Sequence, residues 1–139
     1  MRLNWPAVLV AALAHWVLGA AWFTAFSKAW VAGLRMAPDE LRAYMSHPNP
    51  WPYVIALLCD FLMAYAIARL ISGYESPGLL HGIGAGLLVG LIAALALATE
   101  LVFERMGVSF IVIAAGYPLA GCILMGIIIG AWRPKARTA

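Results

Sequence analysis

Two ionisable side chains and one tyrosine hydroxyl lie inside stretches of the sequence that are otherwise apolar: His15, Asp60 and Tyr117. An imidazole changes charge near neutral pH, so a histidine beside a carboxylate can take up and release a proton. Ionisable groups within an apolar membrane segment are costly, and they commonly mark a pathway or a binding site. The three residues are therefore candidates for an intramembrane polar site that carries a proton or binds a cationic solute.

The same residues also have a structural interpretation. A histidine, an aspartate and a tyrosine can form a hydrogen bond that only holds two helices together, and burial can keep an aspartate neutral. The sequence leaves both interpretations open.

The elements that must position these residues are four long apolar stretches. The chain is 65% hydrophobic and 11% charged, whereas average soluble domains are closer to half apolar and a quarter charged. Each stretch has about 20 to 25 residues, enough for a helix to cross a hydrocarbon core about 30 Å thick. We therefore predict an all-α polytopic membrane protein, a single domain over residues 1–139. It is a four-transmembrane-helix bundle with helices at about 5–26, 53–72, 79–103 and 108–132.

This composition also limits the partners. It excludes a disordered tail, a nucleic-acid-binding module and an ordinary soluble enzyme, and the expected surroundings are a lipid bilayer. The first stretch is longer than the apolar region of a typical signal peptide, so we expect a retained helix.

Estimated depths bring the three polar residues to a similar level. His15 lies about 15 Å from the inner end of the first helix, and Asp60 and Tyr117 lie about 10 and 13 Å below the outer ends of theirs. These depths agree within about one helical turn. His15 interrupts a first stripe of small residues spaced by four, and Asp60 interrupts a second, so both are expected to face protein instead of lipid. The first stripe is Ala7, Ala11 and Gly19, and the second is Ala56, Ala64 and Ala68.

The first connection, residues 27–52, is the longest, and it is predicted to be an outer loop that holds one short amphipathic helix at about 37–45. Pro38 suits the first turn of that helix, and Asp39 and Glu40 complement the positive end of its dipole. A basic tail follows at residues 133–139. Basic residues are slightly more frequent on the side of the two termini, which favours cytoplasmic termini.

Glycines recur every four residues along the third helix, and two more occur late in the fourth. In lipid, such small residues let helix backbones approach closely, either within one chain or across an oligomer. We predict a glycine zipper, with helix packing at Gly78, Gly82, Gly86, Gly90, Gly126 and Gly130.

Few other residues suggest chemistry. Glu100 and Glu104 share a face at the outer end of the third helix, where they could attract a cation or simply be solvated beside Arg105. The estimated depths of Cys59 and Cys122 are too different for a disulfide, so both are expected to be free, buried thiols. No metal-binding, nucleotide-binding or nucleophile motif is present, so we expect no catalytic residue, no metal and no cofactor.

Several segments of the sequence are similar to those of one family. They are Ala20-Ala21-Trp22-Phe23, Lys28-Ala29-Trp30, Met63-Ala64-Tyr65-Ala66-Ile67-Ala68-Arg69, His81-Gly82-Ile83-Gly84-Ala85-Gly86 and Gly116-Tyr117-Pro118. Through them the chain resembles the small bacterial membrane proteins catalogued as domain of unknown function seventeen-sixty-one. The resemblance implies four helices and a bacterial cytoplasmic (inner) membrane, and it supplies no activity.

The leading hypothesis for function is a small proton-linked transport or permeation protein that uses His15 and Asp60. Four short helices rarely enclose a solute path, so it is expected to be a homo-oligomer. The alternative is a non-catalytic accessory or packing subunit of a larger membrane complex. An enzyme is the least favoured class, because no reaction centre is visible.

Overall fold

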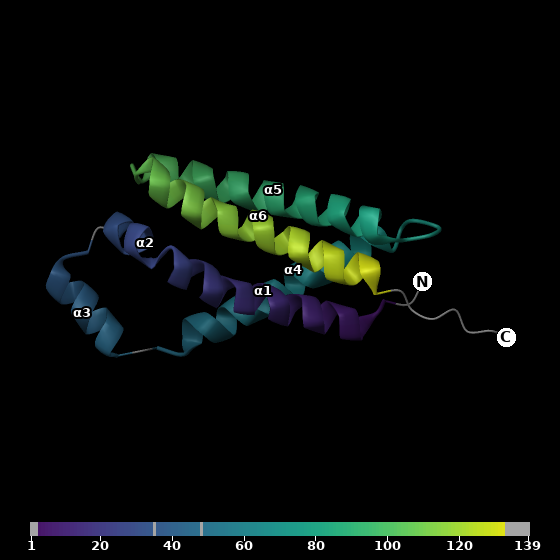
Figure 1. Cartoon of the computed structure of the whole chain (residues 1–139), viewed down its shortest axis with the longest axis horizontal. Coiled ribbons are helices and arrows are strands. Elements are labelled where there is room, and N and C mark those ends of the chain that lie inside the picture. The colour runs from purple at the N-terminus through teal and green to yellow at the C-terminus, as the bar shows by residue number, and fades with distance from the viewer. Residues whose placement is uncertain (1–2, 35, 48, 133–139) are drawn as a thin grey trace.

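The computed structural model describes residues 3–34, 36–47 and 49–132, and this part of the chain is helical with short connections and no strand (Figure 1). The helices are α1 (Trp5–Ala25), α2 (Ser27–Gly33), α3 (Pro38–Ser46), α4 (Trp51–Ile71), α5 (Leu79–Phe103) and α6 (Val108–Ala131). The predicted basic tail at 133–139 lies outside the described residues.

Four of the helices, α1, α4, α5 and α6, are long and apolar enough to cross a membrane. Each begins and ends within two residues of its predicted limits, and α3 is the short helix predicted in the first loop. The prediction of an all-α membrane protein with four transmembrane helices is therefore confirmed.

Local chemistry explains where these helices begin. A proline in the first turn starts α1, α3 and α4, because a proline needs no helical hydrogen-bond partner there. The Asn4 side chain accepts a hydrogen bond from the amide of Ala7, and the Glu40 carboxylate accepts one from the amide of Ala37 at 3.1 Å. Such caps satisfy amides that the helix itself leaves without a partner.

The first connection is more helical than predicted. Residues 27–33, expected to be loop, form α2, which follows α1 after the single residue Phe26. Phe26 donates to the carbonyl of Trp22 and accepts from the amide of Trp30, so backbone bonds run on across the break. The segment is stabilised by tertiary packing, because Gly33 lies directly against the Phe110 ring of α6. A short segment without clear apolar periodicity does not reveal such a contact.

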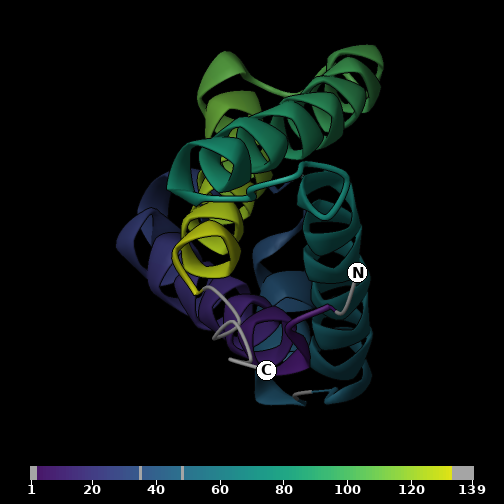
Figure 2. The same ribbon diagram turned by 90° about the vertical axis from the view of Figure 1, so that its right-hand side faces the viewer.

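The two ends of the bundle are distinct. At one end, called here the turn end, α1 begins, α6 ends and the α4–α5 turn lies beside them. The Asn4 side chain donates to the carbonyl of Trp132 at 2.9 Å, and Gly130 packs against Gly78. At the other end, the loop end, lie α2, α3 and the connection between α5 and α6 (Figure 1). Figure 2 views the bundle from the turn end, with the α5–α6 hairpin above α1 and α4 to one side.

The α5–α6 hairpin is the most closely packed part of the molecule. A side chain at Gly82 or Gly86 would collide with the backbone carbonyl of Gly126 or Cys122, and one at Gly90 would lie 3.0 Å from Cys122 Cβ. Gly82, Gly86 and Gly90 of α5 therefore face α6 within the same chain. Backbones that approach this closely gain van der Waals contact that lipid does not supply.

The remaining core joins α1, α4 and α6. Its largest fully buried apolar members are Val8 of α1, Ile67 of α4 and Met125 of α6, surrounded by small alanines. Alanine at positions 11, 12, 64 and 68 lets the three helices meet closely. This core ends one turn from His15 and Asp60, and it supports them from the turn end.

Candidate functional site

The candidate site is a buried contact between His15 of α1 and Asp60 of α4. The Nδ1 atom of His15 lies 2.8 Å from Oδ1 of Asp60, and the two residues are only 1% and 4% exposed. Removing both groups from water costs free energy, which their attraction offsets only when the geometry is good. The two side chains thus occupy one face of the bundle interior, as the small-residue stripes predict, although Ala56 at the start of the second stripe is exposed.

Tyr117 of α6 completes the cluster. Its hydroxyl lies 3.0 Å from Nδ1 of His15 and 3.2 Å from the backbone carbonyl of the same residue. Nδ1 cannot donate to the carboxylate and accept from the hydroxyl at the same time. While Asp60 is ionised it can only accept, so Nδ1 carries the hydrogen and the Tyr117 hydroxyl donates to the His15 carbonyl.

Two atoms of the pair have no hydrogen-bond partner among the described residues: Nε2 of His15 and Oδ2 of Asp60. A buried polar atom without a partner costs about 1–3 kcal/mol and calls for a physical reason. With one titratable proton in addition to the N–H of neutral imidazole, the pair would carry no net charge, whichever side chain held that proton. Loss of that proton would leave one negative charge in an apolar environment. The arrangement is thus suited to binding one proton or a positively charged replacement.

Two glycines make room for the two rings. A side chain at Gly121 of α6 would collide with the imidazole of His15, and one at Gly19 of α1 would lie 2.8 Å from the Tyr117 hydroxyl. Each ring therefore sits over a glycine of the opposite helix, and each glycine follows the ring of its own helix by four residues. Sequence reasoning placed Gly19 in a stripe and missed Gly121. The repeated ring-to-glycine spacing of four is the signal that could have found it.

Further along the same interface, Trp22 of α1 contacts α6. Its indole donates to the carbonyl of Ile113 at 3.0 Å, and a side chain at Gly116 would lie 3.2 Å from the Trp22 ring. Ile113 precedes Ala114, whose carbonyl loses its usual helical donor because Pro118 has no amide hydrogen. The helix α6 continues through Pro118 to Ala131.

The other predicted residues lie apart from the pair. Glu100 and Glu104 are exposed at the loop end of α5, and Glu104 caps the helix instead of lying within it. In the described residues no group of three His, Cys, Asp or Glu side chains could hold a metal ion. Both cysteines are free, as predicted, and Cys122 is buried, but the predicted burial of Cys59 is wrong, because its side chain is exposed. Successive helical residues point about 100° apart, so the residue before inward-facing Asp60 turns towards the perimeter.

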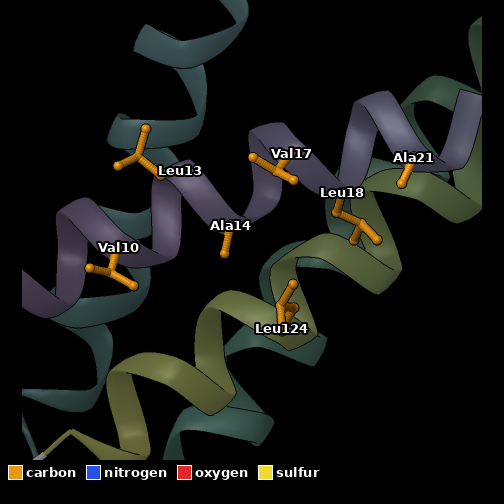
Figure 3. A pocket seen from close by; sticks show the side chains of 7 residues that line it. All are labelled: Val10, Leu13, Ala14, Val17, Leu18, Ala21 and Leu124. Atoms are coloured by element: carbon orange, nitrogen blue, oxygen red, sulfur yellow. The ribbon is translucent and has the colours of Figure 1, made fainter.

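A shallow groove of about 540 Å³ runs along the outside of α1, beside Leu124 of α6 (Figure 3). Its lining is wholly apolar, and three of its side chains, Val10, Leu13 and Val17, are at least 42% exposed. Neither His15 nor Asp60 contributes to it. The groove therefore belongs to the apolar perimeter of the bundle and not to the polar site.

Comparison with known proteins identifies a family without assigning a function. The search of curated proteins and the search of solved structures gave no match. One family model, described as Protein of unknown function (DUF1761), matches residues 6–130 and so includes His15, Asp60 and Tyr117. Since the match covers most of the chain, this four-span membrane protein belongs to that family.

Proposed function

We propose that the protein is a small proton-linked transport or permeation protein whose proton-binding group is the His15–Asp60 pair. The observation that carries this proposal is the 2.8 Å contact between two ionisable side chains inside a membrane-spanning bundle. Ionisable residues at such positions commonly serve as proton relays. The unpartnered Nε2 and Oδ2 atoms support the proposal, because they leave the pair with binding capacity that no described residue uses.

The competing explanation is a structural link between α1 and α4. Well-packed apolar residues often replace a buried ion pair without loss of stability, and sometimes with a gain, so holding two helices together does not by itself require one. The surrounding Ala-rich core already brings α1, α4 and α6 into contact. A functional role therefore explains the presence of the pair better than packing does.

Proton flux into vesicles tests the proposal. Under an imposed membrane potential, we expect the interior of liposomes that contain the purified protein to acidify faster than that of protein-free liposomes. An entrapped pH dye measures the rate. The Asp60→Asn variant should lower the rate to that of protein-free liposomes, because an amide cannot exchange the proton. Asp39→Asn is the matched control, since Asp39 lies on the exposed surface of α3. Equal rates for the wild type and Asp60→Asn would overturn the proposal.

We also propose that the chain resides in the bacterial cytoplasmic membrane with both termini in the cytoplasm, that its partners are lipids and other membrane chains, and that it is not an enzyme. The charge balance of the loops and the family resemblance support the location and orientation. In the described residues the His15 ring contacts Asp60 and the Tyr117 hydroxyl and hydrogen-bonds no serine, threonine or cysteine, which supports a role in binding instead of covalent chemistry.

A second candidate function is that of an oligomer-forming or accessory subunit, and α4 favours it. Residues 51–59, the loop-end half of this helix, are all exposed except the half-buried Leu57, so little of the chain covers that half. The α5 glycines do not support the same idea, because they are already packed against α6.

Native Cys59 tests this candidate because it lies in the exposed half of α4, whereas Cys122 is buried. If a second copy packs there, mild oxidation in vesicles should produce a disulfide-linked dimer that disappears in Cys59→Ser. A chain that stays monomeric under oxidation, and also when native complexes are sized, would contradict assembly through α4.

A further inference from the structure

Burial is unequal on the two sides of the His15–Asp60 pair. The buried core lies wholly on the side of the turn end: its members precede His15 in α1, follow Asp60 in α4 and follow Tyr117 in α6. They are Val8, Ala11, Ala12, Ala64, Ile67, Ala68, Ile71, Cys122, Met125 and Ile129. Interdigitated side chains of this kind leave few voids that a water molecule can enter. The core therefore seals the pair from the turn end.

Towards the loop end the packing differs. No residue of α1 after His15 and no residue of α4 before Asp60 is buried. The buried apolar residues in this half, Ala94, Leu101, Phe110 and Ile113, belong to α5 and α6. The helix α4 also diverges from the α5–α6 hairpin in this direction, with α1 between them (Figure 1). The residues that the structure describes at the loop end thus form no buried core between α4 and the hairpin.

Several half-buried rings lie between the pair and the loop end, and we call three of them the aromatic lid: Trp16, Phe23 and Tyr117. The Phe23 and Tyr117 rings meet edge to face, with centroids 5.3 Å apart. The Trp16 indole donates to the carbonyl of Tyr53, at the loop end of α4, at 3.1 Å. Partly exposed side chains change rotamer rapidly, whereas a packed core opens only by a collective motion.

We infer that, in this conformation, the His15–Asp60 pair exchanges its proton with water at the loop end only, through the aromatic lid, while the turn end is closed. Release of the proton at the turn end then requires a second arrangement of the helices. The inference rests on the proposed function and gives that function a direction. The neighbouring titratable groups on α6 are Tyr117 and Cys122, both within electrostatic reach of Asp60. On α4, Cys59 turns to the perimeter, and α5 carries its ionisable side chains, His81 and Glu100, only towards its ends.

Thiol labelling in sealed vesicles tests the direction of access. In a Cys59→Ser, Cys122→Ala background, a single thiol is introduced by Tyr117→Cys in the lid or by Met125→Cys in the core. Both positions are on α6, eight residues apart, on opposite sides of the level of the pair. A charged, membrane-impermeant methanethiosulfonate is then added outside the vesicles. Phe23→Cys repeats the lid measurement from α1, should Tyr117→Cys fail to fold.

Two surface variants report which end of each molecule faces outwards. Ser46→Cys lies at the exposed end of α3, at the loop end, and Ser76→Cys lies in the exposed α4–α5 turn. In a preparation with unequal orientation, these two variants are labelled to different, complementary fractions. The lid thiol can then be matched to one end or the other without assuming a uniform orientation.

We expect the lid thiol to be labelled to the same fraction as Ser46→Cys, and the core thiol to remain unlabelled from either side. A lid thiol that follows Ser76→Cys, reacts from both sides or does not react would overturn the inference, as would a reactive core thiol. Proton flux measured on wild type and Asp60→Asn in the same vesicles keeps the two proposals distinct. Flux that depends on Asp60 together with the wrong labelling pattern would reject only the direction of access.

Discussion

At the scale of single residues, each ring of the site has a hydrogen-bond partner and a glycine that leaves space for it. The imidazole of His15 needs a partner for Nδ1, which Asp60 supplies, and it needs space, which Gly121 supplies. The Tyr117 hydroxyl donates a hydrogen bond to the backbone carbonyl of His15, and the Tyr117 ring lies against Gly19. An interhelical hydrogen bond in a membrane contributes only about 0.6–2 kcal/mol. The geometry of the pair therefore depends at least as much on the two glycines as on the polar contacts.

The first prediction concerns Gly121. A methyl group at this position would collide with the imidazole, so Gly121→Ala should displace His15 from Asp60 and lower the free energy of unfolding by about 1–3 kcal/mol. Unfolding in mixed detergent micelles measures the loss. Gly84→Ala is the matched control, because nothing lies within 4 Å of a side chain added there. Equal stability of the two variants would show that the ring is not held by Gly121.

The second prediction separates the Tyr117 hydroxyl from its ring. Tyr117→Phe keeps the contacts with Gly19 and Phe23 but removes the donor to the His15 carbonyl. We expect a loss of about 0.5–1.5 kcal/mol in the free energy of unfolding and proton flux that still depends on Asp60. Loss of all flux in a folded Tyr117→Phe protein would instead make the hydroxyl part of the proton path.

The polar members of the site could be predicted because each is a single interruption in an apolar helix, and spacing indicated which way they face. The spacing of four after each ring could have indicated Gly121, but its contact with the His15 ring and the exposure of Cys59 could not be predicted. Both depend on how α1, α4 and α6 are rotated against one another. That rotation is set by close packing across the bundle, which leaves no periodic pattern in any one helix.

At the scale of elements, the α5–α6 hairpin is the firmest unit and α4 the least covered. Hydropathy located all four spans within two residues, since a helix must be apolar over the whole thickness of the hydrocarbon. The helix α2 was missed, because it depends on tertiary contacts such as those of Gly33 with Phe110 and Trp30 with Phe23. The glycine spacing predicted close packing, but it could not distinguish a partner helix in the same chain from one in another copy.

The third prediction tests that hairpin. Gly86→Ala places a methyl group against the Cys122 carbonyl, so the two backbones must separate, and the free energy of unfolding should fall by about 1–3 kcal/mol. Because the collision is within one chain, oligomer size on a native gel should not change. A variant that unfolds like Gly84→Ala but assembles differently would place Gly86 at an interface between copies.

At the scale of the whole molecule, the two ends of the bundle differ in packing and in their connections. The turn end is closed by the core and by the bond from Asn4 to Trp132, whereas the loop end carries α2, α3 and a divergent α4. A bundle with one sealed and one partly open end is asymmetric across the membrane. That asymmetry gives the orientation of the chain a functional meaning.

The fourth prediction fixes this orientation. In intact cells that express single-cysteine variants, the impermeant thiol reagent should label Ser46→Cys and should leave Ser76→Cys unlabelled until the cells are broken. This result is expected if the turn end, with the two termini, faces the cytoplasm. The reverse pattern would invert the chain and direct proton exchange to the cytoplasmic side.

His15 of α1 lies over Gly121 of α6, and Tyr117 of α6 lies over Gly19 of α1. These two contacts restrict how α1 and α6 can move relative to each other. Sliding α1 along α6 by one helical turn, about 5.4 Å, would move both rings off their glycines and onto positions that bear side chains. The helices α1 and α6 must therefore move together as a rigid body. The helix α4 has no contact of this kind, in which a ring lies over one of its glycines, because α4 contains no glycine. A movement that passes the proton on to the other side of the membrane would therefore be a rotation of α4 relative to α1 and α6.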